Sequence, residues 1–184
     1  MSFFKKPAVL IVLSVILILA STTLSVHAKL GRKSSEVTDI FYSDTTESKS
    51  IATLLREYSS ASSTIALIAS DYGLDTDDVS SQAYWLDSAL RYSRGDEPYI
   101  YSEYSLLSKA LVSLERQLES AGLNANDAAQ VEGAFDELDS LQAQILALAS
   151  DYNGQVRSFH RRYGGFPASF MASFAGVEMP EEFA

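Results

Sequence analysis

The carboxylates that lie closest together in the sequence are the first candidates for chemistry. Asp71, Asp75, Asp77 and Asp78 share one short stretch of the chain, and clustered carboxylates can bind a calcium ion. A calcium loop of the EF-hand type also needs a central glycine and a distal glutamate. Here Gly73 is in the wrong position, and no glutamate follows at the required distance. Helix capping and solvation therefore explain these acids better, and an ion-binding loop over Asp71–Asp78 is the alternative.

Other candidates for catalysis or metal binding are few. The chain has no cysteine and only two histidines, of which His160 alone lies outside the N-terminal segment. This ligand set is too small for a zinc site. The sequence has no Gly-x-Ser-x-Gly elbow, no complete Ser-x-x-Lys constellation and no phosphate-binding glycine loop. It therefore predicts a protein without catalytic residues, metal or cofactor, and an enzyme of unrecognised type is the alternative.

A basic cluster surrounds the single C-terminal histidine. Arg157, Arg161 and Arg162 lie with His160 near the end of a predicted helix, where cationic side chains interact favourably with the helix dipole. The same arginines could contact an anionic head group or an acidic protein. We therefore treat them as possible interaction residues.

Charge is distributed unevenly along the chain. Residues 1–33 contain five Lys or Arg residues and no acid, which leaves nine basic and 24 acidic side chains in residues 34–184, a net charge of −15. Such an acidic surface repels phosphate backbones, so nucleic acid is not an expected partner. For the same reason, contact with an anionic bilayer is expected through the N-terminal segment.

The N-terminal segment has the composition of a membrane helix. Residues 7–26 form an uncharged, mostly apolar run, which as a helix would be about 30 Å long and would match the hydrocarbon core of a bilayer. A short basic tip, residues 1–6, precedes it, and Val26-His27-Ala28 has the small-residue pattern of a signal peptidase site. Length favours a retained transmembrane helix or signal anchor over residues 7–28, and cleavage after Ala28 is the alternative.

Flanking charges decide the expected orientation only in part. Lys5 and Lys6 precede the apolar run, while Lys29, Arg32 and Lys33 follow it, so the positive-inside count is nearly balanced. A basic tip, an apolar core and a small-residue exit are typical of an export signal. We therefore expect a single-pass membrane protein with its bulk on the extracytoplasmic side. Its expected partners are the lipid bilayer, through residues 7–26, and an unknown membrane or envelope protein.

The remainder of the chain divides into a linker and a helical domain. Residues 29–50 are the predicted juxtamembrane linker. From about Ser34 to Ser50 the chain is rich in Ser, Thr and acids, which predicts a linker or a frayed helix start. Residues 51–184 place apolar side chains at alternating spacings of four and three, the pattern of helices that pack at shallow angles. The four seams are Ile51, Leu55, Tyr58, Ser62, Ile65, Ala69 and Tyr72; Val79, Ala83, Leu86 and Leu90; Ile100, Tyr104, Leu107, Leu111, Leu114, Leu118 and Ala121; and Val131, Phe135, Leu138, Gln142, Ile145, Ala149, Tyr152, Val156, Phe159 and Tyr163.

Glycine and proline separate these four seams. Gly73, Gly95, Pro98 and Gly122 fall between them and leave loops of a few residues each. Short loops force neighbouring helices to run antiparallel. The sequence therefore predicts an all-α protein, an antiparallel up-and-down four-helix bundle preceded by an N-terminal membrane helix.

The C-terminal third of the chain carries the most specific motif. The motif consists of Tyr152, Asn153, Val156, Phe159, Phe166, Pro167, Ala172, Gly176 and Phe183. It resembles the C-terminal signature of the LemA family, whose helix carries a Tyr-Asn-x-x-Val run before a Phe-Pro pair. Ala149 stands where that family usually has an arginine, and His160 stands in place of a second asparagine. The chain therefore resembles a divergent member.

The resemblance implies a function in the cell envelope. LemA-like proteins are membrane-associated helical proteins with no settled biochemical activity, and they usually keep their N-terminal helix. By this resemblance, residues 51–184 form a LemA-like helical bundle that ends in a short segment after Phe166-Pro167. The resemblance is consistent with a non-catalytic protein-interaction or scaffolding module.

The motif also has an expected structural role. Tyr152, Val156 and Phe159 lie on a heptad seam and should belong to the core. Asn153, one position away from the seam, could form a hydrogen bond with a neighbouring helix or with the returning chain.

The chain must turn after this helix, because Phe166-Pro167 follows two glycines. Phe170, Met171 and Phe174 then offer an apolar face. We expect this face to fold back on the bundle, and contact with a membrane or a partner is the alternative.

Overall fold

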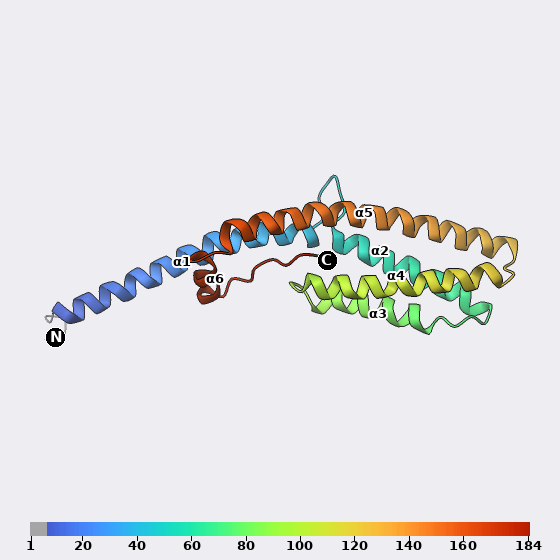
Figure 1. Ribbon diagram of the computed structural model, residues 1–184, viewed down its shortest axis with the longest axis horizontal. Helices are drawn as coiled ribbons and strands as arrows, with labels where there is room; N and C mark the ends of the chain where they lie inside the picture. Colours follow the sequence, from blue (N-terminus) through green and yellow to red (C-terminus); the bar gives the residue numbers. More distant parts are fainter. Residues whose placement is uncertain (1–6) are drawn as a thin grey trace.

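The computed structural model describes residues 7–184, and within that range it describes all side chains except those of residues 7–13, 15, 16, 18 and 19. The regular structure in this part of the chain is entirely α-helical, which confirms that the protein is all-α (Figure 1). Its helices are α1 (Pro7–Tyr42), α2 (Ile51–Asp71), α3 (Asp77–Tyr92), α4 (Glu97–Ser120), α5 (Ala125–Tyr163) and α6 (Ala168–Ala175).

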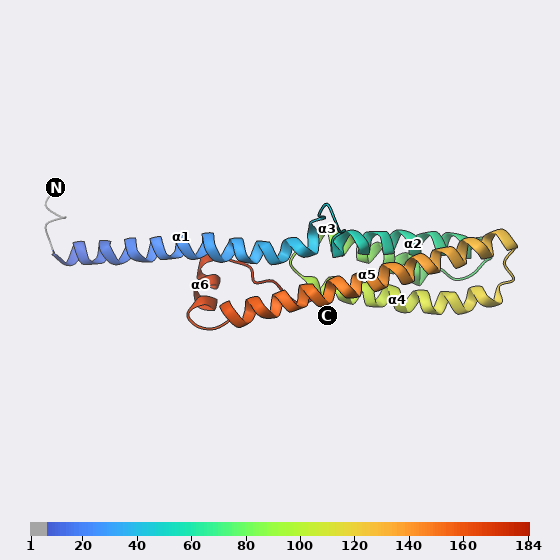
Figure 2. The same ribbon diagram turned by 90° about the horizontal axis from the view of Figure 1, so that it is seen from above.

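The helices form an elongated molecule with two unlike halves. In one half, α2, α3, α4 and α5 run side by side, with α2 packed on α3 and α5, and α3 packed on α4 (Figures 1 and 2). In the other half, α1 projects away, and its C-terminal part packs on α5 and α6. The end of α5 therefore joins the two halves.

The heptad seams form the core of the packed half. Ile51, Leu86, Leu107 and Ile145, one from each of α2 to α5, are completely buried. All other seam residues are buried or partly buried. The spacing of apolar residues therefore predicts which face of each helix is covered.

Side chains at the helix starts satisfy backbone amides that have no partner within the helix. Ser50 caps α2 by accepting a hydrogen bond from the amide of Thr53, and Asp96 caps α4 by accepting one from the amide of Tyr99. Asn124 caps α5 by accepting hydrogen bonds from two amides of its first turn. These polar residues fix where α2, α4 and α5 begin.

Most of the stretch expected to be a juxtamembrane linker or a frayed helix, residues 29–50, is helical. Helix α1 continues to Tyr42, and the irregular stretch is confined to residues 43–50. Leu30, Ser34, Val37 and Phe41 are buried along one face of α1, at the same spacings of four, three and four that mark the other helices. Burial of this seam against α5 and the C-terminal chain explains why a Ser- and Thr-rich stretch remains helical.

The predicted membrane helix over residues 7–28 is not settled by the structure. The basic tip, residues 1–6, and most side chains of residues 7–19 lie outside the described residues. Within the residues that are described, no helix combines the length and the apolarity needed to cross a bilayer.

Candidate functional site

The last eight residues form a strap along the outside of the helices. This C-terminal strap, residues 177–184, follows α6 and runs extended beside α1 and α5 (Figure 1). Its Phe183 is 2% exposed, and the centroid of its ring lies 5.4 Å from that of Phe41 and 5.1 Å from that of Tyr101. The side chain of Phe183 is therefore buried between aromatic residues of α1 and α4.

Residues of the Tyr152-Asn153 motif hold this strap in place. The Tyr152 hydroxyl donates a hydrogen bond to the Glu181 carbonyl at 2.9 Å. The Asn153 amide forms two hydrogen bonds with the Phe183 backbone, donating to its carbonyl at 2.9 Å and accepting from its N–H at 2.8 Å. Asn153 thus binds the returning chain, the second of the two roles expected for it.

One and two turns further along α5, Arg157 and His160 also contact the strap. The His160 Nε2 lies 2.7 Å from the Pro180 carbonyl oxygen, so this nitrogen carries the proton and donates it. Arg157 forms an ion pair with Glu182 at 2.8 Å. The polar face of α5 therefore binds the strap through a hydrogen bond to its backbone and an ion pair with one of its acids.

The buried members of the motif lie beneath these hydrogen bonds. Tyr152 is completely buried, Val156 is 1% exposed, and Phe159 is 5% exposed. The Tyr152 ring meets the Phe41 ring edge-on, with centroids 5.4 Å apart. Burial raises the pKa of Tyr152, so its hydroxyl stays protonated and serves as a donor.

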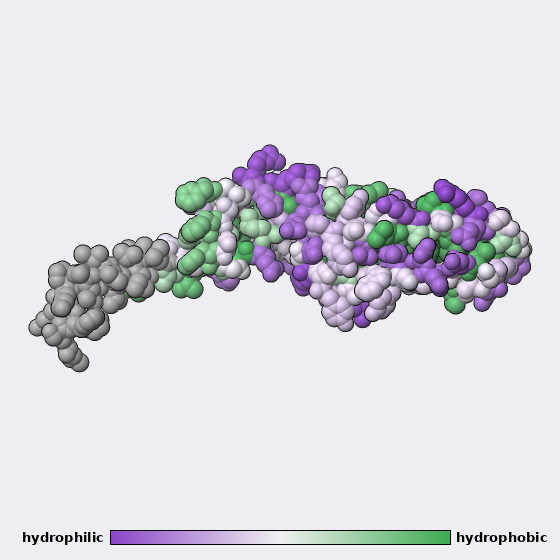
Figure 3. All heavy atoms as spheres, turned by 60° about the horizontal axis from the view of Figure 1, so that its bottom comes forward, coloured by the Kyte–Doolittle hydropathy of each residue, from purple (hydrophilic) through white to green (hydrophobic). Residues whose placement is uncertain are grey.

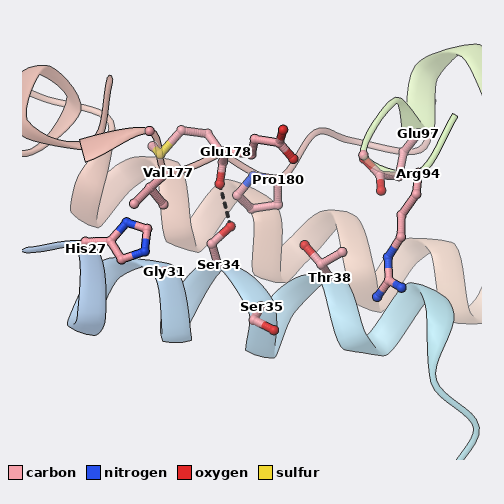
Figure 4. A pocket seen from close by; sticks show the side chains of 13 residues that line it. His27, Gly31, Ser34, Ser35, Thr38, Arg94, Glu97, Val177, Glu178 and Pro180 are labelled. Atoms are coloured by element: carbon pink, nitrogen blue, oxygen red, sulfur yellow. Dashed lines mark hydrogen bonds between the residues drawn. The ribbon is translucent and has the colours of Figure 1, made fainter. Parts of the chain in front are cut away.

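A pocket opens between α1, the turn before α4 and the strap. It has a volume of about 410 Å³. Ser34 and Thr38 point into it from α1, and the Ser34 hydroxyl donates a hydrogen bond to the Glu178 carbonyl at 2.6 Å (Figure 4). Arg94 and Glu97 lie on the opposite side, and we refer to this site as the Glu97 pocket.

Glu97 contributes to this pocket a buried carboxyl group that lacks hydrogen-bond partners within the described chain. It is 1% exposed, and neither carboxylate oxygen has a hydrogen-bond partner among the described residues. Desolvation raises the pKa of Glu97, although the Tyr42 hydroxyl and nearby backbone amides oppose part of this rise. A buried carboxyl group of this kind prefers the neutral form.

Two neighbours complete the surroundings of Glu97. The Tyr42 hydroxyl accepts a hydrogen bond from the Gly95 amide at 3.2 Å, and burial raises the pKa of Tyr42. The Arg94 guanidinium lies over the Tyr42 ring, 4.7 Å from its centroid. The cation in the pocket is therefore directed to an aromatic ring, and Glu97 has no ion-pair partner within the described residues.

The segment after α5 contains further residues of the motif. Pro167 precedes α6 in a cis peptide bond, and Gly176 ends α6 with a φ of 64°, in the left-handed region that favours glycine. Ala172 is 1% exposed, while Phe166 and Phe170 are among the exposed aromatic residues.

The predicted apolar face of this segment is divided. Met171 is partly buried and lines a hollow between α6 and α1, whereas Phe170 and Phe174 are 61% and 69% exposed. The segment thus returns to α1 without covering its phenylalanines. Arg161 and Arg162 are exposed at the nearby end of α5.

The acidic stretch Asp71–Asp78 lies at the other end of the packed half. Asp71 ends α2, Asp77 and Asp78 form the first turn of α3, and the Asp75 carboxylate accepts a hydrogen bond from the Asp77 amide at 3.1 Å. Within the described chain, no group of three or more His, Cys, Asp or Glu residues is arranged to hold a metal ion.

Two parts of this site were not predicted from the sequence. The buried seam of α1, with Phe41 at its end, was signalled by the spacing of Leu30, Ser34 and Val37. Glu97 looked like an ordinary first-turn acid, and its sequence context carries no signal of burial.

Comparison with known proteins adds no relative. No protein-family model matches the chain, and neither a curated protein nor a solved structure matches it significantly.

Proposed function

We propose that this protein is a membrane-anchored, non-catalytic interaction module of the cell envelope, similar to LemA proteins. In this proposal residues 7–26 span the bilayer once, the packed helices stand on its extracytoplasmic side, and the module binds a membrane or envelope protein. The anchor keeps the module near that partner, which raises the partner's effective concentration.

One observation supports this proposal most strongly. Helix α1 is continuous from Pro7 to Tyr42, so the apolar run and the buried seam of Leu30, Val37 and Phe41 belong to one helix. A helix that leaves a bilayer and enters a core without a break would hold the domain at a fixed position. Cleavage after Ala28 would separate the apolar run from this seam.

We also propose that α2 to α5 form an up-and-down four-helix bundle. The buried seams and the short loops support this architecture. The bundle is open on one side, because a hollow of about 470 Å³ lies between α4 and α5. Glu115, Glu132 and Asp136 line it, so a partner bound there would present basic groups.

Membrane fractionation with alkaline carbonate extraction tests the anchor. The full chain should stay in the membrane pellet, and its intact mass should include residues 1–28. A variant with Leu10→Arg and Leu17→Arg should move to the supernatant, because a charge in the hydrocarbon core costs about 2.5–3.5 kcal/mol per residue. The matched control is Leu67→Arg, at a residue of α2 that is 66% exposed.

Two results would overturn the anchor. One is a wild-type chain that carbonate extracts completely, and the other is a mature protein that begins at Lys29. Accessibility of the helices to protease added outside intact cells tests the orientation.

Proximity labelling in native cells tests the interaction module. A labelling enzyme inserted after Glu47, in the exposed stretch between α1 and α2, should enrich a small set of envelope proteins. The comparison is the same enzyme fused to residues 1–28 alone. If both fusions label the same set of proteins to the same extent, the scaffold role is contradicted.

A further inference from the structure

One end of the molecule carries an uncovered aromatic face. Phe166, Phe170 and Phe174 are 86%, 61% and 69% exposed. The Phe166 and Phe170 rings lie 6.5 Å apart, and Phe170 and Phe174 are one helical turn apart, so they share a side of α6. Contiguous exposed apolar groups of this kind mark interaction surfaces.

This aromatic face lies beside the end of the apolar run of α1. His27 directly follows that run, and its Nδ1 lies 3.0 Å from the Ala175 carbonyl oxygen at the end of α6. Helix α6 packs on α1, where its Ala172 is buried. Figure 3 shows hydrophobic surface gathered where the molecule adjoins the grey atoms. If residues 7–26 cross a bilayer, α6 sits at the level of its head groups.

Charge at this end differs in sign from that of the rest of the protein. Residues 27–35 and 152–177 contain basic residues and no acid, although the whole chain has a net charge of −10. Lys33 and Arg157 pair with Glu36 and Glu182. The other four basic side chains are exposed and form no ion pair among the described residues; they are Lys29, Arg32, Arg161 and Arg162, which we name the basic rim.

A hollow opens beside two residues of the basic rim, Lys29 and Arg32. It has a volume of about 620 Å³ and lies between α1 and α6. Val26, Leu30 and Met171 contribute apolar groups to its lining, and Lys29 and Arg32 contribute charges. An apolar floor with cations at the edge matches an anionic phospholipid, whose acyl chain and phosphate need these two environments.

We propose that α6 is an interfacial element that contacts the surface of an anionic bilayer. The phenylalanines insert among the head groups, and the basic rim lies against the lipid phosphates. This inference rests on the proposed anchor, because a helix of eight residues is too short to hold a membrane by itself and needs α1 to bring it to the surface. The acidic half of the molecule is repelled by the same surface and points away from it.

The test uses the absence of cysteine from the chain. A single Ser173→Cys substitution on α6 carries an environment-sensitive fluorophore, in the full chain reconstituted into phosphatidylglycerol vesicles. We expect blue-shifted emission and quenching by lipids spin-labelled near the head group. The matched control is a fluorophore at Ser113→Cys, an exposed residue of α4, which should show neither effect.

Two variations make the test specific. Replacing Phe166, Phe170 and Phe174 together with serine should abolish quenching at position 173, and the fold should survive because these side chains are exposed. Phosphatidylcholine vesicles should give weaker quenching than phosphatidylglycerol vesicles, since the basic rim then lacks lipid anions.

Failures of the two proposals are distinguishable. A chain that does not float with vesicles refutes the anchor. A chain that floats but gives the same emission and quenching at positions 173 and 113 refutes the interfacial role of α6 alone. Protection of position 173 by an added protein in place of lipid would also overturn this role.

Discussion

Asn153 shows how one side chain can hold two distant parts of a chain together. Its amide offers a donor and an acceptor on the same edge, and the Phe183 backbone offers the complementary pair. The adjacent residue, Tyr152, holds the strap two residues earlier, through the hydrogen bond from its hydroxyl to the Glu181 carbonyl. The motif that resembles the LemA signature therefore has a physical purpose, which is to close the C-terminal strap over α5.

Replacing Asn153 with alanine should release the end of the strap. The variant loses two hydrogen bonds in a partly buried site, so we expect a loss of about 1–2 kcal/mol in the free energy of unfolding. Amide hydrogen exchange in residues 177–184 should accelerate. Ser158→Ala, an exposed change on the same helix, should alter stability by no more than about 0.5 kcal/mol. Unchanged exchange in the strap would contradict the assigned role of Asn153.

Replacing Glu97 with glutamine should alter how stability depends on pH. The folded state raises the pKa of Glu97, so it binds this proton more tightly than the unfolded state does. The associated stability is complete below the unfolded pKa and is lost as pH rises through the folded pKa. Glu97→Gln cannot ionise, so its stability relative to wild type should be higher at pH 8 than at pH 4.

Urea unfolding of the detergent-solubilised chain at the two pH values measures this difference. Glu137→Gln, an exposed change on α5, is the control. An advantage of Glu97→Gln that is equal at both pH values would show that the carboxyl group is not the cause.

At the scale of elements, α1 belongs to the packed structure as well as to the N-terminal segment. Phe41 is completely buried and contacts the rings of both Tyr152 and Phe183. The aromatic cluster at this point joins the helix, the motif and the strap. Stability of the strap should therefore depend on α1.

Replacing Phe41 with alanine tests this dependence. Truncation of a fully buried phenylalanine costs about 3–5 kcal/mol, whereas a residue of a flexible linker would cost almost nothing. Leu146→Ala, at a residue that is 53% exposed, should have an effect within about 0.5 kcal/mol. Denaturant unfolding gives both values. Equal effects of the two changes would show that residues 29–42 act as a linker and do not contribute to the core.

The elements differ in how far the sequence predicted them. Heptad spacing identified the buried face of α2 to α5, because a repeat of apolar residues is a local property. The same spacing in α1 is less visible, since Ser34 occupies one of its positions and polar and charged residues of both signs surround it. The path of the strap could not be predicted, because it depends on where α1 and α5 meet. Burial of Glu97 follows from that path as well.

At the scale of the whole molecule, charge and apolarity change along one long axis. The end formed by α6 and the last turn of α5 is basic and aromatic, and the far end carries the acidic stretch Asp71–Asp78. Such an arrangement favours one orientation relative to an anionic surface. Helix α1 would transmit that orientation only if it is rigid between its apolar run and its buried seam.

The most direct test of this account is the distance between two spin labels on α1. Ser14→Cys and Ser35→Cys place labels on exposed positions of the helix, which a continuous α-helix separates by about 32 Å. In lipid nanodiscs we predict a single narrow distance distribution centred near that value. A broad distribution, or a markedly different mean distance, would show that α1 bends between the two positions and would contradict the rigid anchor.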